Sequence, residues 1–548
     1  MAEKSAASAA GMQPARPEDP LVPSLFRKDR LRLQCVCLMC LAYTLSQKVS
    51  IFDRFDAVMA TTTALLPLDA IDLPVLRFPV LHKESFDFGA VQGWQVCLMA
   101  VVVVISAIWE ATRFPRQAAH ATAVDALKTL LVLIGDLLLL PIYIFARPET
   151  PLLGYQNTER NTWLLQQCPS LFSFKQTPWF RNPNISFAAL MWLDSSGEKY
   201  RKFVRRELLT APDGGFVALD WWEDRPDIAE SKKILLIGST FTGDALVHVT
   251  RTVCKNFSAL GWMPVVMVKR GCGRTMPNVQ PGVGLDGSLC DGGHSPAPWC
   301  LTGLSDFELA VDHIAAKFPG IPICSIGLST GGGQLRSYFN NFGERSKIRA
   351  GVVVDAAPNW DNALLSLDRR LPLISKALAV AAMDSYVNCG RGAVTGGEGA
   401  GAGGDACSKD EDFGRLDDRI VPGCMVEFVR DHMGPCFGFE RTTEGAIKYM
   451  NRCLPPESSH CAVPCLELMS FDDQLQCPEQ ARETHGYWKL SPNVITAGTR
   501  QGTHVIRWDG FHGACWLSKV TAEFCEAVLR SEDHEPHTVG HGDPTKER

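Results

Sequence analysis

The stretch that most constrains the fold of this chain is Gly327-Leu328-Ser329-Thr330-Gly331. A short apolar run, 321–326, leads into it, and a segment with helical spacing, 332–342, follows it. Strand, sharp turn and helix in this order form a nucleophile elbow, whose strained turn exposes a serine hydroxyl above a sheet. Because the pattern alone is weak in a chain with 46 glycines, the remaining sequence has to supply partners for Ser329.

Segments with strand and helix patterns alternate on both sides of this stretch. Helical spacing predicts helices over 248–260 and 305–317. Short continuous apolar runs predict strands at 216–221, 233–237, 264–268, 350–354, 465–469 and 504–508. Apolar strands that alternate with helices are typical of a parallel sheet covered on both faces. We therefore expect an α/β fold with a mostly parallel central sheet flanked by helices.

A serine nucleophile needs a histidine to remove its proton and a carboxylate to orient that histidine. On an elbow of this kind the chain order is serine, acid, histidine, each in a loop after a strand. Asp472 and Asp473 follow the strand predicted at 465–469, and His512 follows the strand predicted at 504–508. We predict Asp473 as the acid, with Asp472 as the alternative or as a turn former, and His512 as the base.

Two other histidines are less well placed in this scheme. His504 is expected to lie within the strand predicted at 504–508, and His485 lies in helix-like sequence. Neither is therefore as well placed as His512 to act as the base.

An oxyanion needs backbone N–H donors from the residue after the nucleophile and from the loop after an earlier strand. We predict Thr330 for the first donor and Ser239, in the loop 238–243, for the second. The glycine spacing of that loop also resembles a phosphate-binding loop. Asp244 and Ala245 stand where such a loop needs lysine and serine or threonine, which disfavours nucleotide binding.

The N-terminal region has a different composition. We predict a disordered tail over 1–32, which ends in a basic cluster. We predict a membrane-anchoring region with two or three transmembrane helices over 33–150. Its apolar stretches cover 33–45, 95–109 and 127–146, of which only the last approaches the roughly 20 residues that span a bilayer. We expect an integral membrane protein of the endoplasmic reticulum or another endomembrane.

The side of the membrane stays open. Three spans would place the C-terminal part in the lumen, and two spans would place it in the cytosol. Two glycosylation sequons, at Asn184 and Asn256, are compatible with the lumenal option.

In the remaining chain we expect one large domain, 151–530, followed by a disordered tail, 531–548. A mainly helical insertion at about 358–460 is expected to form a cap, interrupted by a flexible glycine-rich insert at 390–405. The net charge of −6 gives no basic excess for nucleic-acid binding. Cys461 and Cys465 lack a second ligand pair at zinc-site spacing, so we expect no metal.

Six ordered motifs resemble those of a known family. They are Gly327–Gly332, Arg270-Gly271, Trp299 with Asp306-Phe307, Phe437-Gly438-Phe439, Ser470 with Asp472-Asp473, and Phe511-His512-Gly513. Over about 170–530 the chain resembles the membrane-anchored α/β-hydrolase-domain proteins of the embryogenesis-associated and YheT-like group. The resemblance implies an α/β-hydrolase fold and a serine esterase, lipase or phospholipase, in some members an ester-forming acyltransferase, without a cofactor. It assigns Ser329 as nucleophile, Asp473 as acid and His512 as base.

The chain departs from the family pattern in places. Ile237-Gly238 stands where His-Gly or Pro-Gly is usual, Thr330 replaces a common methionine, and 273–298 resembles an insertion. We therefore keep two hypotheses: a membrane-anchored serine hydrolase that cleaves acyl esters of lipids, and a catalytically weak hydrolase-fold membrane scaffold.

Overall fold

The computed structural model describes most of the chain from residue 147 onward. The described residues are 147–212, 214–273, 279–280, 282–283, 289–290, 303–357, 360–370, 374–383, 385, 422–452, 461–476, 491–510 and 513–534. The predicted tail 1–32, nearly all of the predicted membrane-anchoring region 33–150 and the glycine-rich insert 390–405 lie outside them. Within the described part, no helix combines the length and the apolar character needed to cross a bilayer.

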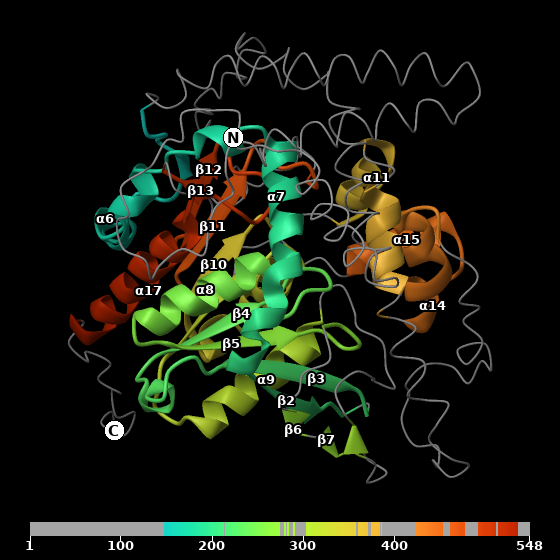
Figure 1. Cartoon of the computed structure of the whole chain (residues 1–548), viewed down its shortest axis with the longest axis horizontal. Coiled ribbons are helices and arrows are strands. Elements are labelled where there is room, and N and C mark those ends of the chain that lie inside the picture. Colours follow the sequence, from blue (N-terminus) through green and yellow to red (C-terminus); the bar gives the residue numbers. More distant parts are fainter. Residues whose placement is uncertain are drawn as a thin grey trace, which may run out of the picture.

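A ten-stranded sheet forms the centre of the domain (Figure 1). In spatial order its strands are β1 (Leu152–Gly154), β12 (Val494–Thr499), β11 (Cys465–Ser470), β10 (Ile348–Val354), β9 (Ile323–Leu328), β4 (Ile234–Gly238), β5 (Met263–Val268), β3 (Phe216–Trp222), β2 (Val204–Thr210) and β6 (Val279–Gln280). The six strands from β12 to β5 are mutually parallel, whereas β3 is antiparallel to both of its neighbours and β1 is antiparallel to β12. The prediction of a mostly parallel sheet is confirmed.

Helices cover both faces of this sheet, as Figure 1 shows. Helices α8 (His248–Ala259) and α17 (Trp516–His534) pack on one face, and α9 (Leu304–Lys317) and α10 (Thr330–Phe342) pack on the other. Along β4, Leu235 and Ile237 belong to the core on the side of α8 and α17, and Ile234 and Leu236 belong to the core on the side of α9 and α10. Side chains of a strand alternate between faces, so burial on both faces explains why the strand reads as a continuous apolar run.

The strand order matches the predicted fold. Counted along the chain from β2, and leaving aside the short strands β6 to β8, the strands lie in the order first, second, fourth, third, then fifth to eighth. Within this set the second strand, β3, runs in the direction opposite to that of its two neighbours, β2 and β5. This is the strand order of the α/β-hydrolase fold, with the elbow after the fifth strand, β9.

One predicted strand is wrong. Residues 504–508 do not form a strand of the sheet: the last strand of the sheet is β12, and Trp508 belongs to a two-stranded ribbon in which it pairs with Cys515. Val505, Ile506 and Trp508 are nevertheless buried, because they fill the core from a loop. Their apolar character made this loop look like a strand, whereas β12, rich in threonine, alanine and glycine, gives a weaker pattern.

A helical group lies between β10 and β11 in the chain, where the cap was predicted. It contains α11 (Trp360–Arg370), α13 (Met425–Phe428), α14 (Gly434–Cys436) and α15 (Thr443–Arg452), and Figure 1 shows α11, α14 and α15 together beside the sheet. The Cys272 thiol, after the carboxyl end of β5, donates a hydrogen bond to the hydroxyl of Ser385 in this group at 3.4 Å. The contact ties the group to the edge of the sheet that carries Ser329.

Candidate active site

The elbow is built as the sequence predicts. Ser329 lies between β9 and α10 with φ of 56°, in the left-handed region that a non-glycine residue adopts at an energetic cost. A Cβ at residue 327 would lie 2.5 Å from the Gly331 carbonyl oxygen, and a Cβ at residue 331 would overlap the backbone of Gly238. The two glycines therefore allow strand, turn and helix to approach. The Ser329 side chain remains partly exposed.

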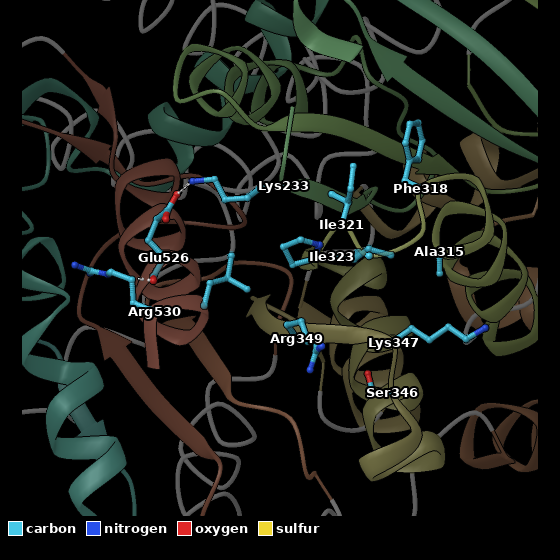
Figure 2. A pocket seen from close by; sticks show the side chains of 13 residues that line it. Lys233, Ala315, Phe318, Ile321, Ile323, Ser346, Lys347, Arg349, Glu526 and Arg530 are labelled. Atoms are coloured by element: carbon cyan, nitrogen blue, oxygen red, sulfur yellow. Dashed lines mark hydrogen bonds and ion pairs between the residues drawn. The ribbon is translucent and has the colours of Figure 1, made fainter. Parts of the chain in front are cut away.

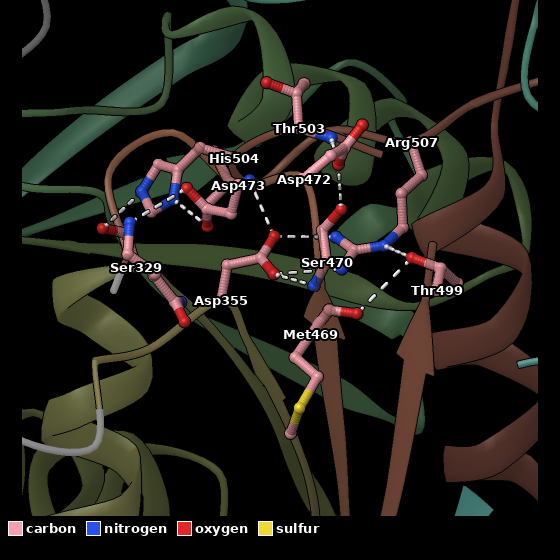
Figure 3. A network of polar contacts seen from close by, with 12 residues as sticks. Ser329, Asp355, Met469, Ser470, Asp472, Asp473, Thr499, Thr503, His504 and Arg507 are labelled. Carbon is pink, nitrogen blue, oxygen red and sulfur yellow. Dashed lines mark hydrogen bonds and ion pairs between the residues drawn. The ribbon is translucent and has the colours of Figure 1, made fainter. Parts of the chain in front are cut away.

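A hydrogen-bonded relay connects Ser329 to a carboxylate (Figure 3). His504 Nε2 lies 2.8 Å from Ser329 Oγ, and His504 Nδ1 lies 2.7 Å from Asp473 Oδ2. With the proton on Nδ1, the imidazole donates to Asp473 and accepts from the serine hydroxyl. The other oxygen of Asp473 accepts the backbone N–H groups of Leu475 and Gln476 at 2.8 and 3.3 Å. Serine, imidazole and carboxylate thus stand in the arrangement that activates a serine nucleophile.

The histidine of this relay is His504, which the sequence ranked below His512, so His504 replaces His512 in the proposal that follows. His512 lies outside the described residues, as does His485, and His504 occupies the position between Ser329 and Asp473. The low rank of His504 follows from the misassigned strand. Once β12 is recognised as the last strand, His504 is the histidine in the loop directly after it.

The residues on either side of His504 are held in unusual backbone conformations. Thr503 and Val505 both have φ of 53°, which is costly for β-branched side chains. The Thr503 N–H donates to Asp472 Oδ1 at 2.9 Å, and the Val505 N–H donates to Asp355 Oδ2 at 2.8 Å. The histidine loop is therefore held at both flanks by carboxylates from other loops.

Asp472 has a structural place here, and it does not contact the imidazole in the way Asp473 does. Its Oδ1 also accepts the Ser470 hydroxyl at 2.5 Å. Burial raises the pKa of Asp472 to about 6, although hydrogen bonds from Ser470 and Thr503 act in the opposite direction. This geometry fits the turn former that the sequence offered as the alternative role of Asp472.

Asp355 follows β10 and is paired with a buried arginine. Arg507 donates to Asp355 Oδ2 at 2.8 Å from one guanidinium nitrogen and to Oδ1 at 3.0 Å from the other. Both side chains have an exposed fraction of 0%. Asp355 Oδ1 also accepts the Ser470 N–H at 2.9 Å, so its carboxylate joins the loop after β11 to the histidine loop (Figure 3).

The charges around His504 set its protonation. Burial lowers the pKa of the imidazole, but the charge and hydrogen bond of Asp473, together with the charge of Asp355, outweigh burial and Arg507, so its pKa is raised above 6.5. The interactions that raise this pKa also stabilise the imidazolium that forms when the serine proton is transferred.

The loop after β4 lies against the elbow. A Cβ at residue 331 would come within 2.6 Å of the Ser239 carbonyl oxygen, so Ser239 lies beside the first turn of α10. Thr330 is the first residue of that helix, where a backbone N–H has no acceptor within the helix. The Ser239 and Thr330 hydroxyls are buried and have no hydrogen-bond partner among the described residues. The two residues predicted as oxyanion donors therefore lie on the two segments that meet at the elbow.

A buried lysine holds this loop. Lys269, directly after β5, donates to the carbonyl oxygens of Ser239 at 2.8 Å and Thr240 at 3.0 Å. Burial lowers the pKa of its ammonium group to about 8. Lys269 was not among the residues predicted for the site, and it stands one residue after the apolar strand β5.

One group of described residues has metal-ligand character: Asp355, Asp473 and His504 each offer an atom within 4.8 Å of the others. Asp355 is already saturated by the Arg507 guanidinium and two backbone amides. A cation there would face the arginine charge, so these residues do not fit a metal ion.

A cavity of about 680 Å³ lies at the opposite edge of the sheet (Figure 2). Lys233, Ile323 and Arg349 line it, at the amino ends of β4, β9 and β10. A six-residue strand such as β9 is about 20 Å long, so this cavity is far from Ser329. Two of its cations are engaged, Lys233 by Glu526 and Lys347 by Asp312.

Comparison with known proteins finds distant relatives. No family model matches the chain. It is 22% identical to human phospholipase ABHD3 over 332 residues, which are 59% of this chain and 72% of the relative. The bovine phospholipase ABHD3 is 23% identical over 332 residues, with the same shares of both chains.

Among solved structures, the Pyrococcus furiosus esterase Pf2001 is 14% identical, with a TM-score of 0.32, covering 61% of this chain and 92% of that one. Est1E from Butyrivibrio proteoclasticus is 14% identical, with a TM-score of 0.31, covering 60% and 99%. The chain has the α/β-hydrolase fold. Its own strand order and elbow carry that assignment.

Proposed function

We propose that the protein is a serine hydrolase that cleaves carboxylic ester bonds, with acyl lipids as substrates. The observation that carries the proposal is the relay from Ser329 through His504 to Asp473, with distances of 2.8 and 2.7 Å. The similarity to relatives named phospholipases supports a lipid ester as the substrate class. A carboxylesterase, a lipase and a phospholipase all use this chemistry.

In the proposed reaction, His504 Nε2 takes the Ser329 proton as Oγ attacks the ester carbonyl carbon. Asp473 holds the imidazole through Nδ1 and stabilises the imidazolium. The backbone N–H groups of Thr330 and Ser239 bind the oxyanion. The intermediate then collapses, the alcohol leaves with the proton from His504, and an acyl-enzyme remains on Ser329. Water, activated by His504, hydrolyses it and releases the acid.

Membrane anchoring is part of the proposal and rests on the sequence. The apolar stretches within 33–150 would hold the domain at an endomembrane, where lipid esters are available. Retention of the full chain in the membrane pellet after alkaline carbonate extraction is the expected result. Complete release into the supernatant would contradict it.

A fluorophosphonate probe, which reacts with activated serines, tests the enzyme itself. We expect membranes that carry the full chain to show labelling that disappears in Ser329→Ala, with a loss of ester turnover of about 10⁴-fold or more. Ser325→Ala, which removes a buried hydroxyl within β9, is the matched control and should keep the labelling. Absence of Ser329-dependent labelling in folded protein would favour the scaffold hypothesis. The mass of a trapped acyl-enzyme would identify the acyl group, and its transfer to an added alcohol would reveal the acyltransferase alternative.

A further inference from the structure

A second carboxylate lies beside the imidazole of His504. Asp355 and Asp473 each bring an oxygen within 4.8 Å of the other and of a His504 ring nitrogen. Asp355 follows β10 and Asp473 follows β11, so they extend from neighbouring parallel strands at the same edge of the sheet. Only Asp473 is at hydrogen-bond distance from the ring, but the charge of each carboxylate favours the imidazolium.

Arg507 neutralises the second carboxylate. Its guanidinium binds both oxygens of Asp355 in a bidentate pair at 2.8 and 3.0 Å, fully buried, while the amides of Val505 and Ser470 fill further acceptor positions. Bidentate arginine pairs fix geometry as well as charge. The stem of Arg507 in turn packs on Gly502, where a Cβ would lie 2.8 Å from Arg507 Cγ.

The pair also explains the backbone around His504. Residues in the left-handed region persist only where their surroundings hold them there. Asp355 holds Val505 through its N–H, and Arg507, two residues further along, is fixed to the same carboxylate. The His504 loop therefore closes on Asp355 as its anchor.

Building on the proposed roles of Ser329 and His504, we propose that Asp355 and Arg507 form a positioning pair for the catalytic histidine. Asp355 fixes the loop that carries His504, and Arg507 neutralises Asp355 so that the imidazole is committed to Asp473. Neither residue takes part in proton transfer.

The proposal predicts opposite effects of the two charges. Among the described residues, the charged groups that act on the imidazole are Asp473, Asp355 and Arg507, and Asp472 faces Asp473 and Arg507 from the neighbouring loop. Removing Arg507 leaves the Asp355 charge unopposed, which favours the imidazolium. Removing the Asp355 charge leaves Arg507 unopposed, which disfavours it. A residue that served only to hold the fold would lower activity without this pattern.

The test is the pH dependence of kcat/KM of the full chain, with a short-chain nitrophenyl ester, for wild type, Asp355→Asn, Arg507→Met and the double variant. The acidic limb reports the base, because its protonation abolishes proton transfer from the serine. We expect its midpoint to rise by about one pH unit in Arg507→Met and to fall by about one unit in Asp355→Asn. The double variant, which removes both charges of the Asp355–Arg507 pair, should lie between them. The loss should fall mainly on kcat, with KM changed less than threefold.

Asp220→Asn is the matched control, because it breaks another buried bidentate pair, Arg206 with Asp220, on strands β2 and β3. It should reduce thermal stability without moving the midpoint. If Arg507→Met does not fold, the double variant is compared with Asp355→Asn, because the two differ only in the Arg507 charge. The double variant should then have the higher midpoint. Midpoints that stay unchanged, or that move in the same direction in folded Asp355 and Arg507 variants, would overturn the proposal. Wild type without Ser329-dependent turnover would overturn the proposed function instead.

Discussion

The elbow and the histidine loop both place non-glycine residues in the left-handed region, and they reach it by different means. At the elbow only Ser329 is strained, and Gly327 and Gly331 on either side give the space it needs. In the histidine loop Thr503 and Val505 are both strained, and carboxylates from the loops after β10 and β11 hold their amides. The first conformation is therefore encoded locally, and the second depends on distant residues. Substitutions should disturb the two regions in correspondingly different ways.

The largest difference is expected between two adjacent aspartates that serve the histidine loop. Asp473→Asn removes the charge that orients the imidazole and should lower kcat by about 10⁴-fold. Asp472→Asn keeps an acceptor for the Thr503 N–H and should lower kcat by less than about tenfold. Steady-state kinetics of both purified variants measure this. Equal losses, or a larger loss in Asp472→Asn, would mean that the acid is wrongly assigned.

At the elbow the expected effect is on stability. Gly331→Ala would drive a Cβ into the backbone of Gly238 and should lower the free energy of unfolding by about 2–3 kcal/mol. Gly320→Ala is the control, because no atom lies within 4 Å of the added Cβ and only its φ of 79° is unsuited to alanine. We expect a loss of about 1 kcal/mol there. Denaturant unfolding compares them, and indistinguishable midpoints would show that the elbow has room to relax.

A smaller effect is expected across the elbow, at the loop after β4. Lys269→Met removes the donor to the Ser239 and Thr240 carbonyls and should lower kcat by about 10- to 100-fold, since misplaced groups lose catalytic efficiency steeply. KM should change little, because the loop acts on the oxyanion. Lys317→Met, which breaks a partly exposed pair with Glu207, serves as the control and should leave kcat unchanged. A loss confined to KM would assign the loop to substrate binding.

The same contrast explains what the sequence could predict. The parallel sheet and the elbow follow from patterns within short windows: apolar runs of buried strands, and glycines on both sides of Ser329. Asp473 and Asp472 could be located because β11 is a clear apolar strand with the acidic pair at its end.

His504 could not be located in this way. Its loop buries Val505, Ile506 and Trp508, so it has the composition of a strand, while β12 ahead of it contains threonine, alanine and glycine. Asp355, Arg507 and Lys269 were missed for a related reason. Their contacts join residues far apart in the chain, such as Asp355 and Arg507, and no local pattern encodes such a pair.

The central claim is that His504 serves as the base for Ser329. Fluorophosphonate labelling of His504→Ala and His512→Ala, each in folded full-length protein beside wild type, tests it most directly. We predict that labelling of Ser329 falls by at least about 100-fold in His504→Ala and stays close to wild type in His512→Ala. Retained labelling in His504→Ala together with its loss in His512→Ala would contradict the account.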